Sequence, residues 1–258
     1  MTATAADLVL RRDRMLALIR ERDFVRVGEL SERFGISEVT VRSDLDALAA
    51  SGDVQRIRGG AIPREHAFEV SETSFAAEKL AIGRAAAELI RDGETLLMEV
   101  GTTLAATARA LVGRPELRNV TVFTNGLKTA LELEAATPRI TVVLLGGTLR
   151  PLQHSLVEPM ASLILEQINV HTLFLGCNGV DPVGGVTNVN LPEAEVKKRM
   201  LKAARRVVVL ADGSKIGRTE LAHLCPIDRV DLVITGESAD PQVVEQLRKR
   251  ECEVKIVT

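Results

Sequence analysis

A stretch near the N-terminus carries the pattern of a short helix with two unlike faces. Three apolar residues recur at i, i+4 and i+7, a spacing that predicts one buried stripe: Val41, Leu45 and Leu48. Ser37 precedes the stripe as a favoured N-cap, and Glu38 follows it where the helix dipole favours a negative charge. Thr40, Arg42 and Ser43 fall outside the stripe. We therefore expect a helix that presents hydrogen-bonding side chains to solvent.

Two helices are expected before this one and a hairpin after it. Residues 13–21 and 28–34 show helical apolar spacing, and Gly35 is the left-handed residue expected between two closely joined helices. Residues 54–57 then alternate into Arg58-Gly59-Gly60-Ala61, where the glycine pair permits the positive φ of a tight turn. Three helices followed by such a hairpin predict a winged helix-turn-helix.

This arrangement suits duplex DNA. One helix of a winged helix-turn-helix lies in the major groove, while cations on the hairpin contact phosphates. Arg56 and Arg58 share one face of the hairpin by the period of two. The residues expected to contact DNA are Ser37, Thr40, Arg42, Ser43, Arg56, Arg58 and Gly59. Two alternatives are a structural domain whose polar face is merely solvated and a protein-docking module, which predicts no sequence-dependent DNA binding.

The pattern changes beyond residue 63. Residues 64–73 are polar and helix-poor, which predicts a linker between a DNA-binding domain over residues 1–63 and a larger domain over residues 74–258. The larger domain begins with a helix over residues 78–90. We expect strands at residues 95–100, 120–124, 140–145, 172–177, 207–211 and 230–235, and a last apolar run at 254–257. Because these runs are mostly continuous Val, Leu and Ile, they predict an open α/β sheet of mostly parallel strands.

Glycine and polar residues gather where the predicted strands end. In open α/β sheets, ligands bind beyond the carboxyl ends of the strands. After the first strand, Gly101, Thr102 and Thr103 open a helix, and amides plus hydroxyls at a helix start form an anion site. The other clusters are Thr124-Asn125-Gly126, Gly146-Gly147-Thr148, Gly176 to Gly179 and Asp212-Gly213-Ser214-Lys215. Five successive clusters predict a ligand pocket, although glycine also ends strands for structural reasons alone.

Composition and charge narrow the class of protein. The chain has 258 residues, 46% hydrophobic and 26% charged, enough for two domains with sizeable cores. The net charge is −2, and residues 1–63 carry ten Arg and ten acidic residues, so DNA affinity must come from local clustering rather than bulk charge. With no Trp, no Tyr and six Phe, the stacking platforms for single strands are largely missing, which favours duplex DNA.

Cysteine, histidine and apolar-run patterns give three further expectations. The three Cys include no CxxC pair and the four His are scattered, which predicts free thiols, no metal and no cofactor. No apolar run approaches the roughly 18 residues of a membrane helix. The N-terminus shows no basic segment followed by a long apolar one. We expect a cytoplasmic protein without a membrane partner.

Three short motifs carry a family resemblance. They are Ser37-Glu38-Val39-Thr40-Val41-Arg42, Asp44-Leu45 and Arg58-Gly59-Gly60-Ala61. In these motifs, and onward to about residue 235, the chain resembles the DeoR family of bacterial transcriptional regulators. The resemblance implies a repressor of carbohydrate-metabolism genes, with a sensor domain related to sugar-phosphate isomerases that binds a phosphorylated sugar. Ser43 stands where the family usually has a second Arg, and Arg58 where it often has His, so no operator sequence is transferred.

The resemblance also implies roles for residues at the strand ends. Gly101, Thr102 and Thr103 would hold the phosphate, Asp212 and Lys215 would line the pocket, and Glu193 matches a recurrent family acid. The full set of expected effector-binding residues is Glu99, Gly101, Thr102, Thr103, Asn125, Gly146, Gly147, Glu193, Asp212 and Lys215. The chain has Glu99 where the family usually has Asp, Val100 where it usually has a small residue, and Glu158 where a Gly is common. These departures point to an unusual effector or an altered pocket.

A second hypothesis is that the larger domain is an active sugar-phosphate isomerase. Glu99, Asp212 and Lys215 are residue types that can supply a general base and a cation to stabilise an enediolate. A free enzyme needs no tethered winged helix, so we favour a regulator. Symmetric DNA sites and the family's habit also predict a homo-oligomer, a dimer or tetramer, in which the effector changes the spacing of paired recognition helices.

Overall fold

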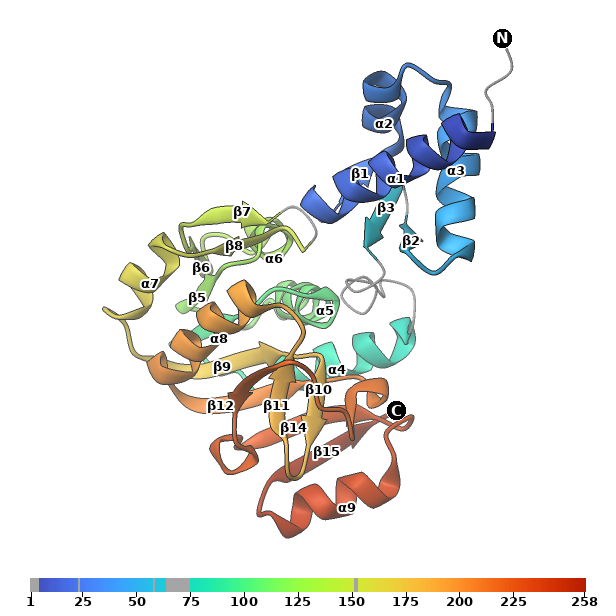
Figure 1. Ribbon diagram of the computed structural model, residues 1–258. Helices are drawn as coiled ribbons and strands as arrows, with labels where there is room; N and C mark the ends of the chain where they lie inside the picture. The colour runs from blue at the N-terminus through green and yellow to red at the C-terminus, as the bar shows by residue number, and fades with distance from the viewer. Residues whose placement is uncertain (1–4, 23, 58, 64–74, 151–152) are drawn as a thin grey trace. The chain divides into compact units, whose positions relative to one another are not determined.

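The chain folds into two compact units. The computed structural model describes residues 5–22, 24–57, 59–63, 75–150 and 153–258. The boundary between the units falls between Ser71 and Glu72. In Figure 1 the N-terminal unit is coloured in blues, and the C-terminal unit runs from green to red.

The N-terminal unit is the expected winged helix-turn-helix. Its elements are α1 (Ala5–Arg22), β1 (Val25–Arg26), α2 (Val27–Phe34), α3 (Glu38–Ala50), β2 (Val54–Ile57) and β3 (Gly60–Pro63). The three strands form an antiparallel sheet in the order β1-β3-β2. Its core gathers the inner stripes of all three helices, including Met15, Ile19, Leu30, Val41 and Leu45, each fully buried.

The first helix is longer than its apolar spacing predicted. It begins at Ala5, whereas the sequence pattern placed its start at residue 13. The added turns include Arg11 and Arg12, which both form ion pairs with the buried Asp44 of α3. Ion pairs produce no apolar periodicity in a sequence, so the apolar spacing did not predict these turns.

Two glycine positions have a clear steric reason. Gly35 closes α2 with φ 61° and donates its amide to the Ser31 carbonyl, as expected of a left-handed residue between two helices. Gly60 packs directly beneath the backbone of Val25 and the ring of Phe24, where a Cβ atom would collide with both. Close approach of the backbone therefore requires glycine at position 60 of the wing.

The C-terminal unit is built on one seven-stranded sheet. The strands of this sheet are β4 (Thr95–Met98), β5 (Val120–Thr124), β6 (Ile140–Leu144), β9 (Val170–Gly176), β12 (Ala204–Leu210), β14 (Leu232–Gly236) and β15 (Glu253–Val257). Their order is β15-β14-β12-β9-β4-β5-β6, and every neighbouring pair is parallel. The chain builds outward from β4 to β6, then returns to place β9 on the other side of β4. The predicted parallel sheet is confirmed, and its switch point lies between β4 and β9.

Helices cover both faces of this sheet. They are α4 (Ala76–Glu88), α5 (Thr102–Val112), α6 (Leu127–Glu134), α7 (Met160–Leu165), α8 (Leu191–Ala203) and α9 (Pro241–Lys249). Leu96 and Met98 of β4 pack with α4 and α5, while Leu97, between them, belongs to the core under α7, α8 and α9. This alternation explains the continuous apolar strand sequences, because both faces of the sheet are buried.

Five short strands lie outside the main sheet and were not predicted. β7 (Thr148–Arg150) and β8 (Ser155–Val157) form a hairpin. β10 (Gly179–Asp181), β11 (Gly185–Asn188) and β13 (Ala222–Cys225) form an antiparallel sheet. The sequences of these five strands form neither continuous apolar runs nor clear alternations, so no sequence pattern predicted them. The hairpin nevertheless supplies two side chains to the candidate site described below.

Candidate functional site

The start of α3 is fixed by its N-cap. Ser37 has an extended backbone (φ −65°, ψ 151°), and its side-chain oxygen accepts the Thr40 amide at 3.2 Å. The Ser37 and Thr40 hydroxyls also lie 2.9 Å apart and hydrogen-bond to each other. The predicted cap is therefore present. It engages Thr40, whose side chain is half-buried and already satisfied by Ser37.

The inner side of α3 joins the helix to α1. Asp44 is 1% exposed, and its two carboxylate oxygens accept from Arg11 Nε at 2.7 Å and Arg12 Nε at 2.9 Å. A buried carboxylate needs such partners because leaving it without them would cost several kcal/mol. The pairs therefore hold α3 against α1 in one orientation.

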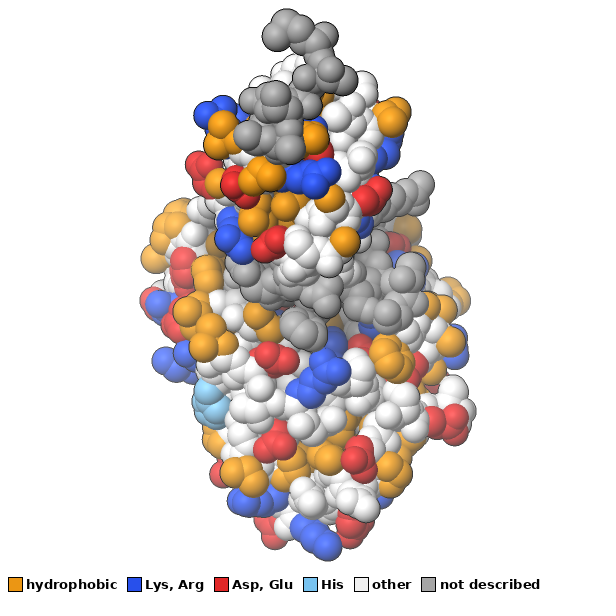
Figure 2. Space-filling view, turned by 45° about the vertical axis from the view of Figure 1, so that its right-hand side comes forward, with side chains coloured by type: hydrophobic (Ala, Val, Ile, Leu, Met, Phe, Trp, Pro, Cys, Tyr) orange, Lys and Arg blue, Asp and Glu red, His pale blue; other side chains and the backbone are white. Residues whose placement is uncertain are grey.

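The outer side of α3 presents Arg42 and Ser43 to solvent. Arg42 Nη2 lies 2.6 Å from Glu38 Oε2, and both side chains are about half exposed. An exposed pair of this kind is worth less than about 1 kcal/mol, so Arg42 can exchange it for another anion. Figure 2 draws one side of the whole molecule, and on its coloured part acidic and basic side chains are interspersed without a dominant basic patch.

The wing arginine is folded back on the helix. Arg56 Nη1 donates to the Arg42 carbonyl at 3.1 Å and pairs with the Asp46 carboxylate. The expected partner on its face, Arg58, lies outside the described residues. Gly59 has φ 85° with open space around it, as the turn of the hairpin requires.

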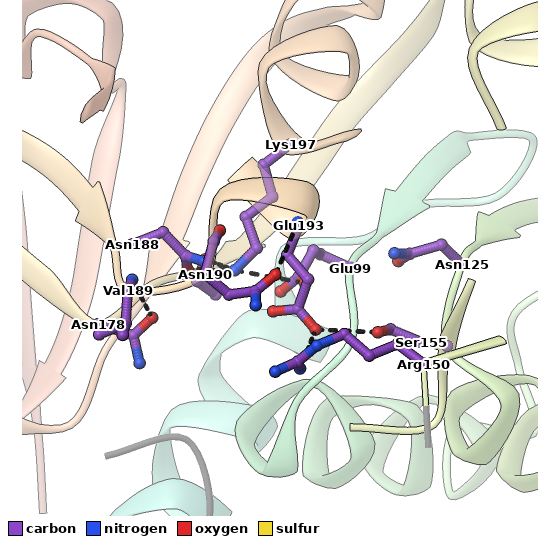
Figure 3. A network of polar contacts seen from close by, with 12 residues as sticks. Glu99, Asn125, Arg150, Ser155, Asn178, Asn188, Val189, Asn190, Glu193 and Lys197 are labelled. Atoms are coloured by element: carbon purple, nitrogen blue, oxygen red, sulfur yellow. Dashed lines mark hydrogen bonds and ion pairs between the residues drawn. The ribbon is translucent and has the colours of Figure 1, made fainter. Parts of the chain in front are cut away.

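Three of the predicted site residues of the second unit lie close together in a network of polar contacts. Figure 3 shows Glu99, after β4, and Glu193, in the first turn of α8, close together, with Asn125, after β5, nearby. Glu99, Asn125 and Glu193 are all buried. Glu99 follows β4, one of the two strands that flank the switch point of the sheet, where ligands of open α/β folds bind.

Glu99 faces a lysine that the sequence analysis did not single out. Lys197 of α8 places its Nζ 3.3 Å from Glu99 Oε1 and donates to the Gly176 carbonyl at 3.0 Å and to Asn188 Oδ1 at 2.8 Å. Neither Glu99 oxygen has a hydrogen-bond partner of good geometry. The pKa of Glu99 is raised to about 7, chiefly by burial; Lys197 opposes this change, and the nearby Glu193 contributes to it.

A second buried ion pair adjoins the first. Arg150 Nη1 and Ser155 Oγ each donate to Glu193 Oε1 at 2.9 Å, from the β7–β8 hairpin. The Glu193 amide donates to Asn190 Oδ1 at 3.0 Å, so Asn190 caps α8. Arg150 and Ser155 were missed because their hairpin leaves no sequence period. Asn125 donates to the Leu156 carbonyl at 3.2 Å, and its Oδ1 has no partner.

The helix start after β4 has the form of an anion cradle. Gly101 precedes α5 with φ 138° and ψ 164°, a conformation that favours glycine, and Thr102 and Thr103 are the first helical residues. The first amides of a helix have no partner within it and carry the positive end of its dipole. Thr103 is buried, and Gly101 and Thr102 are partly exposed.

Asp212 and Lys215 lie beside this network, at the end of β12. Asp212 is buried, and Lys215 Nζ is 3.7 Å from its Oδ2. Burial raises the pKa of the Cys177 thiol to about 11, while Lys215, Lys197, Asp212 and Glu99 also act on it electrostatically. The Asp212–Lys215 pair and the Glu99–Lys197 pair thus both influence the thiol of Cys177, which follows β9.

Two predicted glycines have a backbone role. Gly147 has φ 149° and passes so close to the Val157 carbonyl that a Cβ atom would collide with it. Gly146 packs against Met160, where a Cβ would lie 3.2 Å from that residue's own Cβ. Close packing against Val157 and Met160 therefore explains why both positions are glycine.

Glu78 is a further contact that the sequence did not reveal. Its Oε1 accepts the Gly213 amide at 2.7 Å, and its Oε2 accepts the Ser238 hydroxyl at 2.7 Å. Glu78 lies in the first turn of α4 and so ties that helix to the turns after β12 and β14. An acid in a first helical turn is common for electrostatic reasons, so no sequence pattern indicated this role.

Two features are absent from the described residues. They contain no group of three or more His, Cys, Asp or Glu side chains placed to hold a metal ion. Among the helices of the described part of the chain, none is long and apolar enough to cross a membrane.

Comparisons with known proteins match both units. Residues 11–66 match the DeoR-like helix-turn-helix domain, and residues 74–237 match the DeoR C-terminal sensor domain. The HTH-type transcriptional regulator GlpR of Haloferax volcanii is 33% identical over 242 residues, which cover 92% of this chain and 93% of that one. The glycerol-3-phosphate regulon repressor of Escherichia coli K12 is 28% identical over 253 residues, which cover 95% and 98%.

Among solved structures, ribose 5-phosphate isomerase A of Methanocaldococcus jannaschii is similar over 55% of each chain, with 21% identity and a TM-score of 0.41. The two domain matches fall in the order expected from the sequence motifs and together span most of the chain. The chain belongs to the DeoR family of transcriptional regulators.

Proposed function

We propose that this protein is a repressor of carbohydrate-metabolism genes whose affinity for its operator is controlled by a phosphorylated sugar or a related metabolite. The observation that carries the proposal is the outer side of α3, an N-capped helix in a DeoR-like helix-turn-helix that exposes Arg42 and Ser43. Repression is the mode that the family resemblance implies, and it is the printed role of the glycerol-3-phosphate regulon repressor.

The proposed DNA contacts divide by role. Arg42 and Ser43 reach base edges, while Arg56 and Gly59 of the wing meet the phosphate backbone. Ser37 orders the first turn of α3 and leaves its remaining hydrogen-bonding capacity to a phosphate. Thr40 contributes chiefly through the cap, because its hydroxyl already bonds to Ser37. Arg58 remains a proposed contact on the strength of the sequence.

The proposed effector site lies at the switch point of the seven-stranded sheet. The amides of Gly101, Thr102 and Thr103 receive the phosphate at the start of α5. Glu99 and Asn125 supply buried oxygen acceptors that have no hydrogen-bond partner, which suits the hydroxyl groups of a sugar. The charged residues around them are Glu193, Lys197, Arg150, Asp212 and Lys215.

The proposed organisation is a DNA-binding domain over residues 1–63, a linker over residues 64–73 and a sensor domain over residues 74–258. We also propose that the protein is cytoplasmic and works as a dimer or tetramer, because paired recognition helices match symmetric DNA sites. Sedimentation at micromolar concentration tests the assembly: a monomer that binds DNA singly would contradict it.

The sensor domain is proposed to bind its ligand without turning it over. Glu99 has a pKa near neutrality, as a general base would. In this structure, however, it faces the Lys197 ammonium, which is itself held by Gly176 and Asn188. Incubation with ribose 5-phosphate and related sugar phosphates, followed by product analysis, tests this point. Measurable turnover at ordinary enzyme concentrations would establish the isomerase alternative instead.

Selection from random duplexes tests DNA recognition. The full-length protein should enrich a defined sequence, and Arg42→Ala should weaken binding to that sequence by roughly tenfold or more, as expected when a base-edge contact worth about 1–3 kcal/mol is lost. Arg56→Ala should weaken all duplexes evenly and lower the salt dependence by about one phosphate contact. Failure of the wild-type protein to prefer any sequence over random duplex would refute the proposal.

A thermal-shift screen against phosphorylated sugars tests the effector site. A specific ligand stabilises the fold by mass action, so its identity emerges from the largest shift. Thr102→Val should retain DNA binding and lose most of that shift. An unchanged response in Thr102→Val would remove this residue from the site.

A further inference from the structure

Val39 is an exposed apolar residue in the first turn of α3. Its relative exposure is 73%, whereas Val41 and Leu45 of the same helix are fully buried. The core of the N-terminal unit is completed by the inner stripe of α3 and does not include Val39. The fold itself therefore gives no reason for an apolar side chain at this position.

The surroundings of Val39 are polar and regularly spaced. Arg42, Ser43 and Asp46 stand at i+3, i+4 and i+7 from it, and all three are exposed. These four residues form one outer stripe along α3, opposite the buried stripe. An apolar group next to an arginine and a serine on one helical face matches the mixed chemistry of a base-pair edge in the major groove.

We propose that Val39 reads a thymine by packing its methyl groups against the C5-methyl of that base in the major groove. Thymine is the one DNA base that offers a methyl group there. The inference rests on the proposed DNA binding of this unit and adds a specificity-determining residue to it. Arg42 and Ser43, one turn along the same stripe, make the adjacent hydrogen bonds to base edges.

Thr40 cannot take this role in the same way. Its hydroxyl bonds to the Ser37 hydroxyl, its amide bonds to Ser37 Oγ, and its side chain is half-buried. Val39, one residue after the helix begins, is instead exposed. A docking surface for a protein partner is less suited to this stripe, because Val39 is its one apolar residue and its neighbours are charged or hydroxylated.

Removal of a single methyl group from the DNA tests the proposal. After selection from random duplexes with the full-length protein, each thymine of the enriched site is replaced in turn by deoxyuridine, which lacks only the C5-methyl. At one thymine in each half-site, this change should weaken binding of the wild-type protein by about fourfold, the fold-change expected for one buried methyl group. Val39→Ala should bind the site more weakly and lose its response to deoxyuridine at that position.

A matched control uses the exposed Val183 of the C-terminal unit, which is 85% exposed. Val183→Ala makes the same chemical change and should keep the wild-type response to deoxyuridine. Thermal unfolding should show Val39→Ala to be as stable as wild type, because the removed atoms lie in solvent. If a sequence is enriched but no thymine is sensitive, or the sensitivity survives in Val39→Ala, the inference fails and DNA recognition stands. If wild type enriches nothing, DNA recognition and the inference fail together.

Discussion

Glu99 is a carboxyl group that the fold has taken wholly out of water. It lies where β4 ends, without a hydrogen-bond partner on either oxygen and with Lys197 as its nearest cation. Desolvation raises its pKa to about 7, even though Lys197 opposes the change. Because its pKa lies near neutrality, Glu99 affects the free energy of unfolding and the charge of the proposed site over the same pH range.

The Glu99 pKa predicts a pH-dependent loss of stability. From the ordinary value of 4.5, the unfolded chain releases the proton while the folded protein keeps it until about pH 7. The free energy of unfolding should therefore decline between these pH values, by roughly 3 kcal/mol, and then level off. In Glu99→Gln this decline should be absent.

Urea unfolding at pH 5 and pH 8 measures the difference. Glu245→Gln, on the exposed side of α9, is the matched control and should keep the wild-type slope. The same decline in wild type and Glu99→Gln would show that another group causes it. The slope, rather than the absolute stability, is decisive, because Glu99→Gln also leaves Lys197 without its carboxylate.

Asp44 should matter for stability more than its position on the recognition helix suggests. Asp44→Asn keeps the shape of the side chain but removes the charge that pairs with Arg11 and Arg12. We expect a loss of about 2 kcal/mol from the N-terminal unit. Faster hydrogen exchange of α1 and α3 amides would report it. Asp46→Asn, at an exposed position, should change exchange little, and equal effects of both substitutions would contradict the assigned role.

At the scale of elements, α3 separates its two tasks by face. The inner face, with Val41 and Leu45, completes the core, and the outer face, with Val39, Arg42 and Ser43, points to solvent. Its starting point is fixed by Ser37. The orientation of the outer face therefore depends on a cap and a core that the outer residues do not form.

Loss of the cap should destabilise α3 without removing any of its outer side chains. Ser37→Ala removes the acceptor for the Thr40 amide and should cost about 1 kcal/mol of unfolding free energy. Ser43→Ala deletes the same hydroxyl from an exposed position and should cost almost nothing. Thermal unfolding followed by helical circular dichroism compares the two. Equal stability of both variants would exclude a capping role for Ser37.

The sequence predicted long periodic elements better than local chemistry. The helix from Ser37 was confirmed because its apolar residues recur at helical spacing, and the seven parallel strands were confirmed because each is a largely continuous apolar run. The β7–β8 hairpin was not, so Arg150 and Ser155 were missed as partners of Glu193. Lys197 was missed for another reason: a lysine in a polar helix sequence is usually solvated, and only tertiary packing buries this one against Glu99.

At the scale of the whole molecule, two units with separate cores belong to one chain. The order of strands brings the ends of β4 and β9 together at the switch point, which gathers Glu99 and Gly176 although 77 positions separate them in sequence. Any communication between a ligand there and DNA at α3 must obey thermodynamic linkage, whatever its structural route.

Linkage makes a reciprocal prediction. If a phosphorylated sugar weakens operator binding by some factor, saturating operator should weaken binding of that sugar by the same factor. Fluorescence anisotropy of a labelled duplex gives the first factor, and calorimetry with and without duplex gives the second. A sugar phosphate that binds the protein and leaves operator affinity unchanged would contradict its role as effector.

The separation of faces on α3 has a consequence for how such a protein diversifies. Exchanges at exposed positions away from caps usually change folding free energy by less than about 0.5 kcal/mol. If these residues contact DNA as proposed, substitutions at Val39, Arg42 or Ser43 can be selected for a new promoter while the buried core of the N-terminal unit stays intact. Proteins that share this fold can in this way come to bind many different sites in a genome.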